Sequence, residues 1–110
     1  MTETIDVLIE KLKDKKEARI TDIDGVKRVL PVGKFVFLQA SEYPEKVFVL
    51  QEIIWRGHIP EGVKLLRFGY HIIGKKPKRQ GKWVWGQFCP FITDGDMRKL
   101  IDMAKDVGIL

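Results

Sequence analysis

The sequence predicts a single α+β domain, residues 1–110, in which an antiparallel β-meander sheet is packed by a C-terminal helix and covered by an additional N-terminal helix. Three observations predict this fold class. A chain of 110 residues is long enough for only one hydrophobic core. Helical periodicity occurs over residues 1–16 and 93–110, whereas β-prone runs fill residues 18–92. Short turns join these runs, and this favours antiparallel pairing because parallel pairing needs a long crossover.

The segment from Thr2 to Lys16 is expected to form an amphipathic helix. Acidic residues occupy its first turn and lysines its end, which is the charge order that complements the helix dipole. Its apolar residues follow the i, i+3, i+4, i+7 spacing of one buried stripe, namely Ile5, Leu8, Ile9 and Leu12.

A β-hairpin is predicted from Ala18 to Leu30. Asp24 and Gly25 lie between two short β-prone runs, and this dipeptide is typical of a type I′ turn, in which both central residues have positive φ. Pro31 and Gly33 are expected to end the second strand of the hairpin.

Four longer strands are predicted after the hairpin, because β-branched and aromatic residues are enriched in four segments separated by turn residues. Neither face of the last segment is polar, so this strand is expected to be covered on both sides. The four predicted strands are Lys34 to Ala40, Lys46 to Arg56, Val63 to Ile73 and Lys82 to Ile92.

The C-terminal helix is predicted to begin after Thr93. Thr93 followed three residues later by Asp96 has the form of a capping box, and Gly108 is expected to end the helix. The helical spacing predicts a buried stripe made of Met97, Leu100, Ile101, Ala104 and Val107.

The positive charge of the chain is concentrated in one part of the sequence. The formal net charge is +5, but the window from Gly62 to Thr93 carries +7 and no acidic residue, and the remaining 78 residues carry −2. Six of the 11 aromatic residues fall in the same window. Basic and aromatic residues together are typical of surfaces that bind polyanions.

The centre of this window is a basic loop, Gly74 to Lys82, with five cations in nine residues. We interpret it either as a phosphate-binding loop or as a solvated turn whose lysines protect the edge of a sheet. If it binds nucleic acid, its cations would contact phosphates and neighbouring strand residues would line a groove. The candidate phosphate contacts are Lys75, Lys76, Lys78, Arg79 and Lys82, and the candidate groove residues are Arg67, Tyr70 and Trp83.

Two pairs of residues on the predicted third and fourth strands allow a structural or a functional interpretation. Trp83 and Trp85 fall on the same face, where they either pack in the core or offer a surface on which bases stack. Gly69 and Gly86 remove side chains from the sheet surface, either to let the sheet curve or to leave a groove, which Arg67 and His71 would flank.

The order of these elements resembles the Whirly and positive-cofactor type single-stranded DNA-binding domains, in which four antiparallel strands are followed by one amphipathic helix. The resemblance covers about 75 residues from Lys34 onward and is one of architecture. It implies a homodimer packed through the C-terminal helices, with nucleic acid across the curved sheet.

The leading hypothesis is a nucleic-acid-binding module for DNA or RNA that contacts the phosphate backbone and stacks bases, is single-strand-binding and tolerates many sequences. The first alternative is a protein-interaction or assembly module, a homo-oligomer in which Trp83, Trp85 and the apolar helix face bury against another subunit. The second alternative is a small metal-dependent nuclease with a magnesium ion at Asp22, Asp24 and Glu52.

The remaining function classes are disfavoured by the absence of their motifs. Neither His58 nor His71 has an acidic residue at metal-ligand spacing, and the sequence contains no glycine-rich phosphate motif. We therefore expect no catalytic residue, no metal and no cofactor.

The location of the protein is predicted from three features of the sequence. The apolar runs are too short to cross a bilayer, Met1 to Glu10 lacks a secretory leader, and Cys89 is the single cysteine. These features favour a cytoplasmic protein with no membrane partner.

Overall fold

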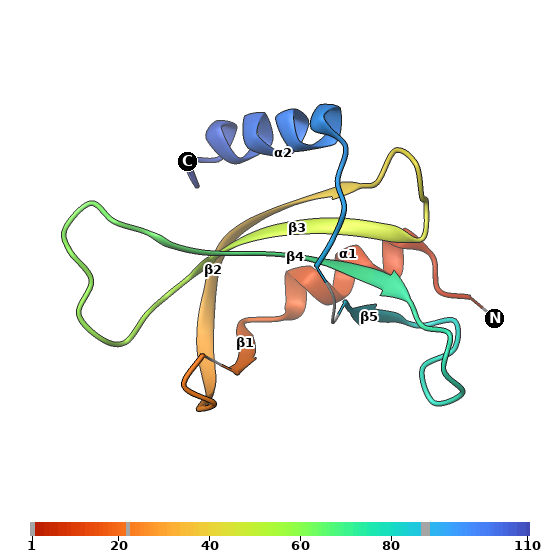
Figure 1. The fold of residues 1–110 in the computed structure, drawn as a ribbon, viewed down its shortest axis with the longest axis horizontal. Helices are drawn as coiled ribbons and strands as arrows, with labels where there is room; N and C mark the ends of the chain where they lie inside the picture. Colours follow the sequence, from red (N-terminus) through yellow and green to blue (C-terminus); the bar gives the residue numbers. More distant parts are fainter. Residues whose placement is uncertain (1, 22, 87–88) are drawn as a thin grey trace.

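The computed structural model describes residues 2–21, 23–86 and 89–110, and it has an antiparallel five-stranded sheet with the strands in chain order (Figure 1). This confirms the predicted α+β meander with a helix at each end. The elements are α1 (Ile5–Asp14), β1 (Glu17–Thr21), β2 (Lys27–Gln39), β3 (Lys46–Ile53), β4 (Leu65–Ile73), β5 (Trp83–Trp85) and α2 (Asp94–Asp106).

The two helices cover opposite faces of the sheet, and this arrangement produces two hydrophobic clusters (Figure 1). Alternate residues of β3 point to opposite faces. Val47 and Val49 therefore pack in the cluster that contains Leu8 of α1, whereas Phe48 packs in the cluster that contains Leu100 of α2. The apolar stripe predicted for the N-terminal helix is confirmed, because Leu8 and Leu12 are buried.

Strand β2 differs from the prediction because Pro31 and Gly33 do not end it. Its first part pairs with β1 and its second part with β3, and the register shifts between Val32 and Phe35. Pro31 lacks an N–H donor, but its carbonyl accepts from the N–H of Ile54 at 2.9 Å. Pro31 and Gly33 thus mark the point where β2 stops pairing with β1 and begins to pair with β3.

The turn between β1 and β2 is not the predicted type I′ turn. Thr21 pairs with Lys27, so five residues connect the strands, and Asp22 lies outside the described residues. Gly25 has a φ of +78°, whereas no described residue other than glycine has a positive φ. The Asp24 side chain closes the turn instead by accepting from the N–H of Val26 at 2.9 Å.

The last predicted strand is much shorter than expected. Within the described residues the β4–β5 ladder comprises Trp83, Val84 and Trp85, and the N–H of Gly86 also donates to Tyr70 at 2.8 Å. The Gln87 and Phe88 part of the prediction lies outside the described residues. From Cys89 the chain runs away from β5 toward α2 without strand pairing (Figure 1). Proline cannot donate to a ladder, and Pro90 therefore opposes extension of the strand.

Helix α2 begins as predicted, and the Thr93 hydroxyl oxygen accepts from the N–H of Asp96 at 3.0 Å. The Asp96 carboxylate also accepts from the backbone N–H of Ser41 at 2.9 Å, which ties the helix to the end of β2. Gly108 has a φ of +83° at the end of the helix. The predicted burial of Val107 is wrong, because the chain turns there and buries Ile109 instead.

Neither α1 nor α2, the helices of the described part of the chain, has the length and apolar character needed to cross a membrane.

Candidate nucleic-acid interface

The basic loop from Gly74 to Lys82 is held in shape by its own backbone hydrogen bonds. The N–H of Gly74 donates to Lys82 at 2.8 Å, and the N–H of Arg79 donates to Lys76 at 2.9 Å. Gly74 permits this fold because a Cβ atom there would overlap the carbonyl group of Arg79. Gly81 has a φ of +76°, a conformation that favours glycine. The loop therefore presents its cations from a defined backbone.

The five cations of the basic loop do not all line the same cavity. Lys76 and Arg79 line a cavity on the α1 side of the sheet. Lys75 lines a cavity on the other side and forms an ion pair with Glu45 at 2.9 Å, which raises the pKa of the lysine. Lys78 and Lys82 are exposed and line neither cavity.

The cavity on the α1 side, named here the α1 cleft, lies between α1 and the paired strands β4 and β5 and has a volume of about 750 Å³. Lys11 and Lys15 reach it from α1, so four cations from two distant parts of the chain line one cleft with the side chains of His71, Trp83 and Trp85. No described residue that lines the α1 cleft carries a carboxylate.

The four cations of the α1 cleft differ in their pairing. Lys11 Nζ lies 2.8 Å from Glu3 Oε1, and the hydrogen bond from Lys11 lowers the pKa of the Glu3 carboxyl. Within the described chain, Lys15, Lys76 and Arg79 have no ion-pair partner. These three charges are therefore available to an anionic ligand.

Three side chains stack across β4 and β5, and two of them, Trp85 and His71, line the α1 cleft. The Trp85 ring lies over Gly69, where a Cβ atom would overlap it. Arg67 Cζ lies 3.9 Å from the centroid of this ring, and the His71 ring contacts it edge-on at a centroid distance of 5.0 Å. Burial lowers the pKa of the Arg67 guanidinium, which nevertheless stays protonated at neutral pH.

His71 is neutral at physiological pH. Burial, followed by the nearby charges of Lys15, Arg67 and Lys11, lowers the pKa of His71 from 6.5 to about 4. Its Nδ1 atom is buried and has no hydrogen-bond partner in the described structure. A neutral imidazole adds hydrogen-bonding capacity to the cleft without adding charge.

Two of the predicted groove residues are buried: Trp83 lies at the base of the α1 cleft, whereas Tyr70 lies on the other face of the sheet. Trp83 is 8% exposed, packs with Leu8 and Leu12, and donates from its indole N–H to the carbonyl of Thr4 at 2.8 Å, so the core interpretation holds for this residue. Tyr70 is 7% exposed and packs in the hydrophobic cluster under α2, on the opposite face of the sheet.

The two glycines that suggested a groove instead accommodate aromatic rings of the chain itself. Trp85 covers Gly69, and the Tyr70 ring occupies the space that a Cβ atom of Gly86 would need. Residue alternation within a single strand could not show this, since each ring comes from the neighbouring strand. The sequence pattern also did not single out Lys11, in the last turn of α1, and Lys15, its C-cap, although they are four residues apart.

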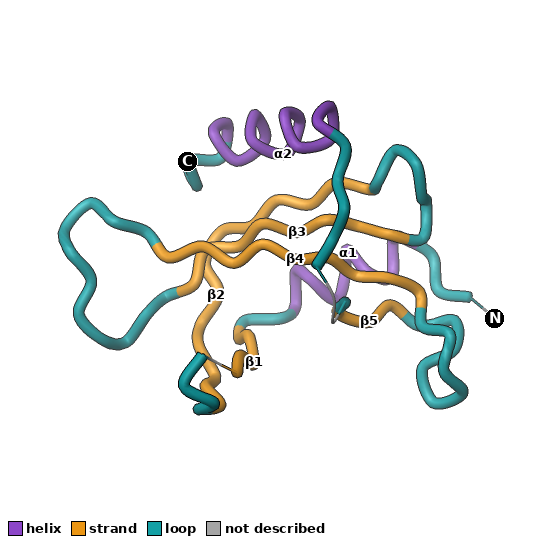
Figure 2. Tube along the Cα trace, viewed as in Figure 1, coloured by secondary structure: helices purple, strands orange, loops and turns teal. Residues whose placement is uncertain are grey.

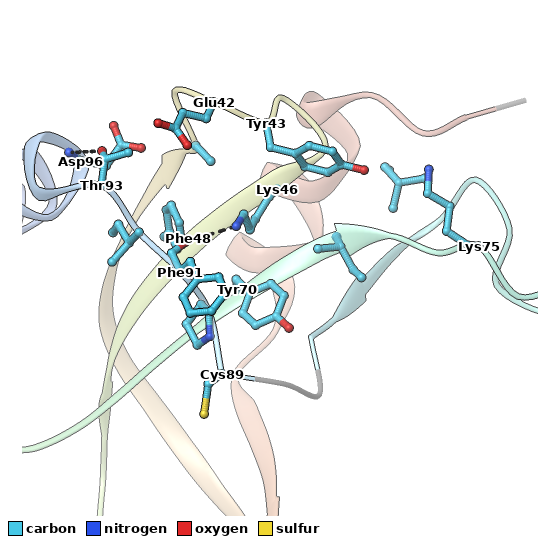
Figure 3. Close-up of a pocket in the computed structure, with 15 residues that line it drawn as sticks. Glu42, Tyr43, Lys46, Phe48, Tyr70, Lys75, Cys89, Phe91, Thr93 and Asp96 are labelled. Atoms are coloured by element: carbon cyan, nitrogen blue, oxygen red, sulfur yellow. Dashed lines mark hydrogen bonds between the residues drawn. The ribbon is translucent and has the colours of Figure 1, made fainter.

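A second cavity of about 680 Å³, named here the α2 cavity, lies on the opposite face of the sheet (Figure 3). It differs from the α1 cleft because Glu42 and Asp96 contribute carboxylates to its lining. Phe91, at its edge, is 90% exposed, and its carbonyl accepts from Lys46 Nζ at 3.2 Å.

The residues proposed for a magnesium site are engaged elsewhere. The Asp24 carboxylate is paired with Arg28 at 3.0 Å, and the Glu52 carboxylate is paired with Lys64 at 3.2 Å. Asp22 lies outside the described residues. Among the residues that are described, no group of three histidine, cysteine or acidic side chains is placed to hold a metal ion.

Comparisons with protein-family models, curated proteins and solved structures found no match to this chain. The resemblance to the Whirly and positive-cofactor type domains therefore stays a prediction.

Proposed function

We propose that this protein is a nucleic-acid-binding module that holds the phosphates of a single strand in the α1 cleft and tolerates many sequences. One observation carries the proposal. Four cations from α1 and the basic loop line the α1 cleft, and its described lining contains no carboxylate. Such a site favours a polyanion whose charges are repeated along a chain.

The three cations without ion-pair partners supply most of the expected affinity. A phosphate that contacts Lys15, Lys76 or Arg79 releases condensed counterions, and this gain in entropy does not depend on the base sequence. The planar guanidinium of Arg79 can also bind two phosphate oxygens at once. Contacts of this kind position a strand without reading its sequence.

The dimensions of the α1 cleft favour a single strand over a duplex. Its volume of about 750 Å³ lies within the range of sites that enclose small molecules, about 300–1,000 Å³. A nucleotide-sized unit fits a site of this class, whereas a double helix would contact only its rim. We therefore expect single-stranded DNA or RNA to bind more tightly than duplex DNA.

The direct test is a fluorescence-anisotropy titration of labelled single-stranded DNA, single-stranded RNA and duplex DNA at low salt. The test variant carries Lys15→Gln, Lys76→Gln and Arg79→Gln. A matched control carries Arg98→Gln, Lys99→Gln and Lys105→Gln, which remove one arginine and two lysines from α2. Both variants lose the same charge, so a general electrostatic effect would weaken binding equally in the two.

We expect the variant of the α1 cleft to lose at least ten-fold in affinity, since about 1.4 kcal/mol corresponds to a factor of ten. The α2 control should stay within about two-fold of the original protein on the same scale. Equal losses in the two variants, or no binding of any strand by the original protein, would contradict the proposal.

A second candidate function is assembly with further copies of this chain into a homo-oligomer, and one observation favours it. Phe91 is 90% exposed beside the α2 cavity, and Tyr43 on the same cavity is 45% exposed. An exposed aromatic pair next to a cavity is typical of protein interfaces. Sedimentation velocity of the original protein and of Phe91→Asp tests it. An oligomer that the substitution dissociates would support assembly, and a monomer at all concentrations would exclude it.

A further inference from the structure

A third cavity lies on the same side of the sheet as the α1 cleft. This hairpin cavity has a volume of about 500 Å³ and lies between the β1–β2 hairpin and residues 55–67. Arg67 lines the hairpin cavity, whereas Trp85, which its guanidinium covers at 3.9 Å, lines the α1 cleft. The Arg67–Trp85 contact therefore lies between the two cavities.

Strand register places both cavities on the face that α1 covers. Arg67 lies opposite Gln51, and residue alternation in β3 puts Gln51 on the same face as Val49, which packs in the cluster with α1. Ile53 follows on that face and lines the hairpin cavity. Gln51 Oε1 is buried without a hydrogen-bond partner in the described structure, as is Nδ1 of His71.

The hairpin cavity resembles the α1 cleft in combining cations with an indole ring. Arg28 and Arg67 line it, and Arg28, which pairs with Asp24 at 3.0 Å, has its Cζ 5.4 Å from the centroid of the Trp55 ring. Arg56 lies beside Trp55 in an adjoining depression of about 310 Å³. No described residue that lines either space carries a carboxylate, in contrast to the α2 cavity.

We propose that a bound single strand continues from the α1 cleft, past the Arg67–Trp85 contact, into the hairpin cavity. This inference rests on the proposed function and adds the length and direction of the ligand. Trp55 and the guanidinium planes of Arg28 and Arg67 supply surfaces on which bases stack. The ligand is then an oligonucleotide of several nucleotides, because a mononucleotide would fill only one end of the path from the α1 cleft to the hairpin cavity.

The length of β4 sets the scale of this path. Each strand residue advances about 3.3 Å, so the six steps from His71 to Leu65 cover ~20 Å. The loops that precede and follow β4 lie at opposite ends of the molecule (Figure 2). Single-strand sites on other small domains cover roughly 4–16 nucleotides, and we expect a footprint in the lower half of that range.

The experiment compares labelled oligo-dT of about four and about twelve nucleotides, lengths that bracket the expected footprint. The test variant is Arg28→Gln with Arg56→Gln. Its control is Arg98→Gln with Lys99→Gln, in which Arg98 also pairs with an aspartate four residues away, as Arg28 does. Thermal unfolding of each variant checks that the fold is retained, and oligo-rU of the same lengths tests whether RNA follows the same path.

The original protein should bind the longer strand at least about five-fold more tightly than the shorter one, beyond the statistical gain of extra binding positions. The hairpin-cavity variant should lose this advantage and bind the shorter strand normally, whereas its control should keep both affinities. If both lengths bind the original protein equally, the inference is overturned and the proposed function stands. If neither length binds at low salt, the proposed function itself fails.

Discussion

The guanidinium of Arg67 lies over the indole of Trp85, with 3.9 Å between Arg67 Cζ and the ring centroid. The same indole lies on Gly69, so the sheet surface, the aromatic ring and the cation form one stack. A cation over an indole is stabilised by about 0.5–2 kcal/mol, more when water is excluded. The contact therefore fixes a positive charge between the α1 cleft and the hairpin cavity.

Replacing Gly69 with alanine tests whether the Trp85 ring needs the space above this glycine. The added Cβ atom would overlap the ring, and we expect the free energy of unfolding to fall by about 1–3 kcal/mol. Gly95 is the matched control, because a Cβ atom there meets nothing within 4 Å and alanine favours a helix. Gly95→Ala should be neutral or stabilise by up to about 1 kcal/mol. Chemical denaturation measures both, and equal effects would contradict the stack.

The lowered pKa of His71 predicts a dependence of stability on pH. The unfolded chain protonates His71 near pH 6.5 and the folded protein only near pH 4, so the unfolded state binds more protons between these values. Stability should therefore fall as the pH drops from 6.5 toward 4, by at most about 3 kcal/mol from this residue. Unfolding free energies of the original protein and His71→Gln, measured from pH 7 to pH 5, should show a flatter profile for the variant.

The range above pH 5 separates His71 from the acidic residues. Hydrogen bonds lower the pKa of the carboxyls of Glu3, Asp24 and Asp96, and their contributions are lost only as the pH falls through the acidic range below about 5. These carboxyls are present in both the original protein and the His71→Gln variant, so they contribute equally to the two profiles. Identical profiles for the original protein and His71→Gln would show that His71 is not shielded from water as the structure indicates.

The N-terminal cap of α2 gives a local test of stability. Thr93→Ala removes the oxygen that accepts from the N–H of Asp96 and should cost about 1 kcal/mol. Thr93→Ser keeps that oxygen and should cost much less. Chemical denaturation of the two variants checks the difference. A serine variant as unstable as the alanine variant would indicate that the methyl group, rather than the cap, stabilises the helix.

The fold could be predicted from the sequence where one local pattern determines the structure. The apolar spacing of α1 and the Thr93 cap of α2 involve residues within one helix, and both were predicted. The course of β2 through Pro31 depends on which strands lie on each side, and the pattern within that strand does not contain this information.

The candidate site was predicted less well, because it is assembled from two distant segments. The charge of the basic loop was visible in the sequence, but Lys15 joins Lys76 and Arg79 only because α1 packs beside β5. The difference in burial between Trp83 and Trp85 has the same origin. Both share one face of β5 and line the α1 cleft, but α1 buries Trp83, whereas Trp85 stays partly exposed.

The salt dependence of binding tests the central claim most directly. For single strands, the slope of log affinity against log salt concentration changes by about 0.7 for each phosphate contact. The variant Lys15→Gln, Lys76→Gln and Arg79→Gln removes three cations of the α1 cleft, so its slope should be shallower by about 2 than that of the original protein. The control Arg98→Gln, Lys99→Gln and Lys105→Gln should keep the original slope. Equal slopes for the original protein and the variant of the α1 cleft would contradict the account.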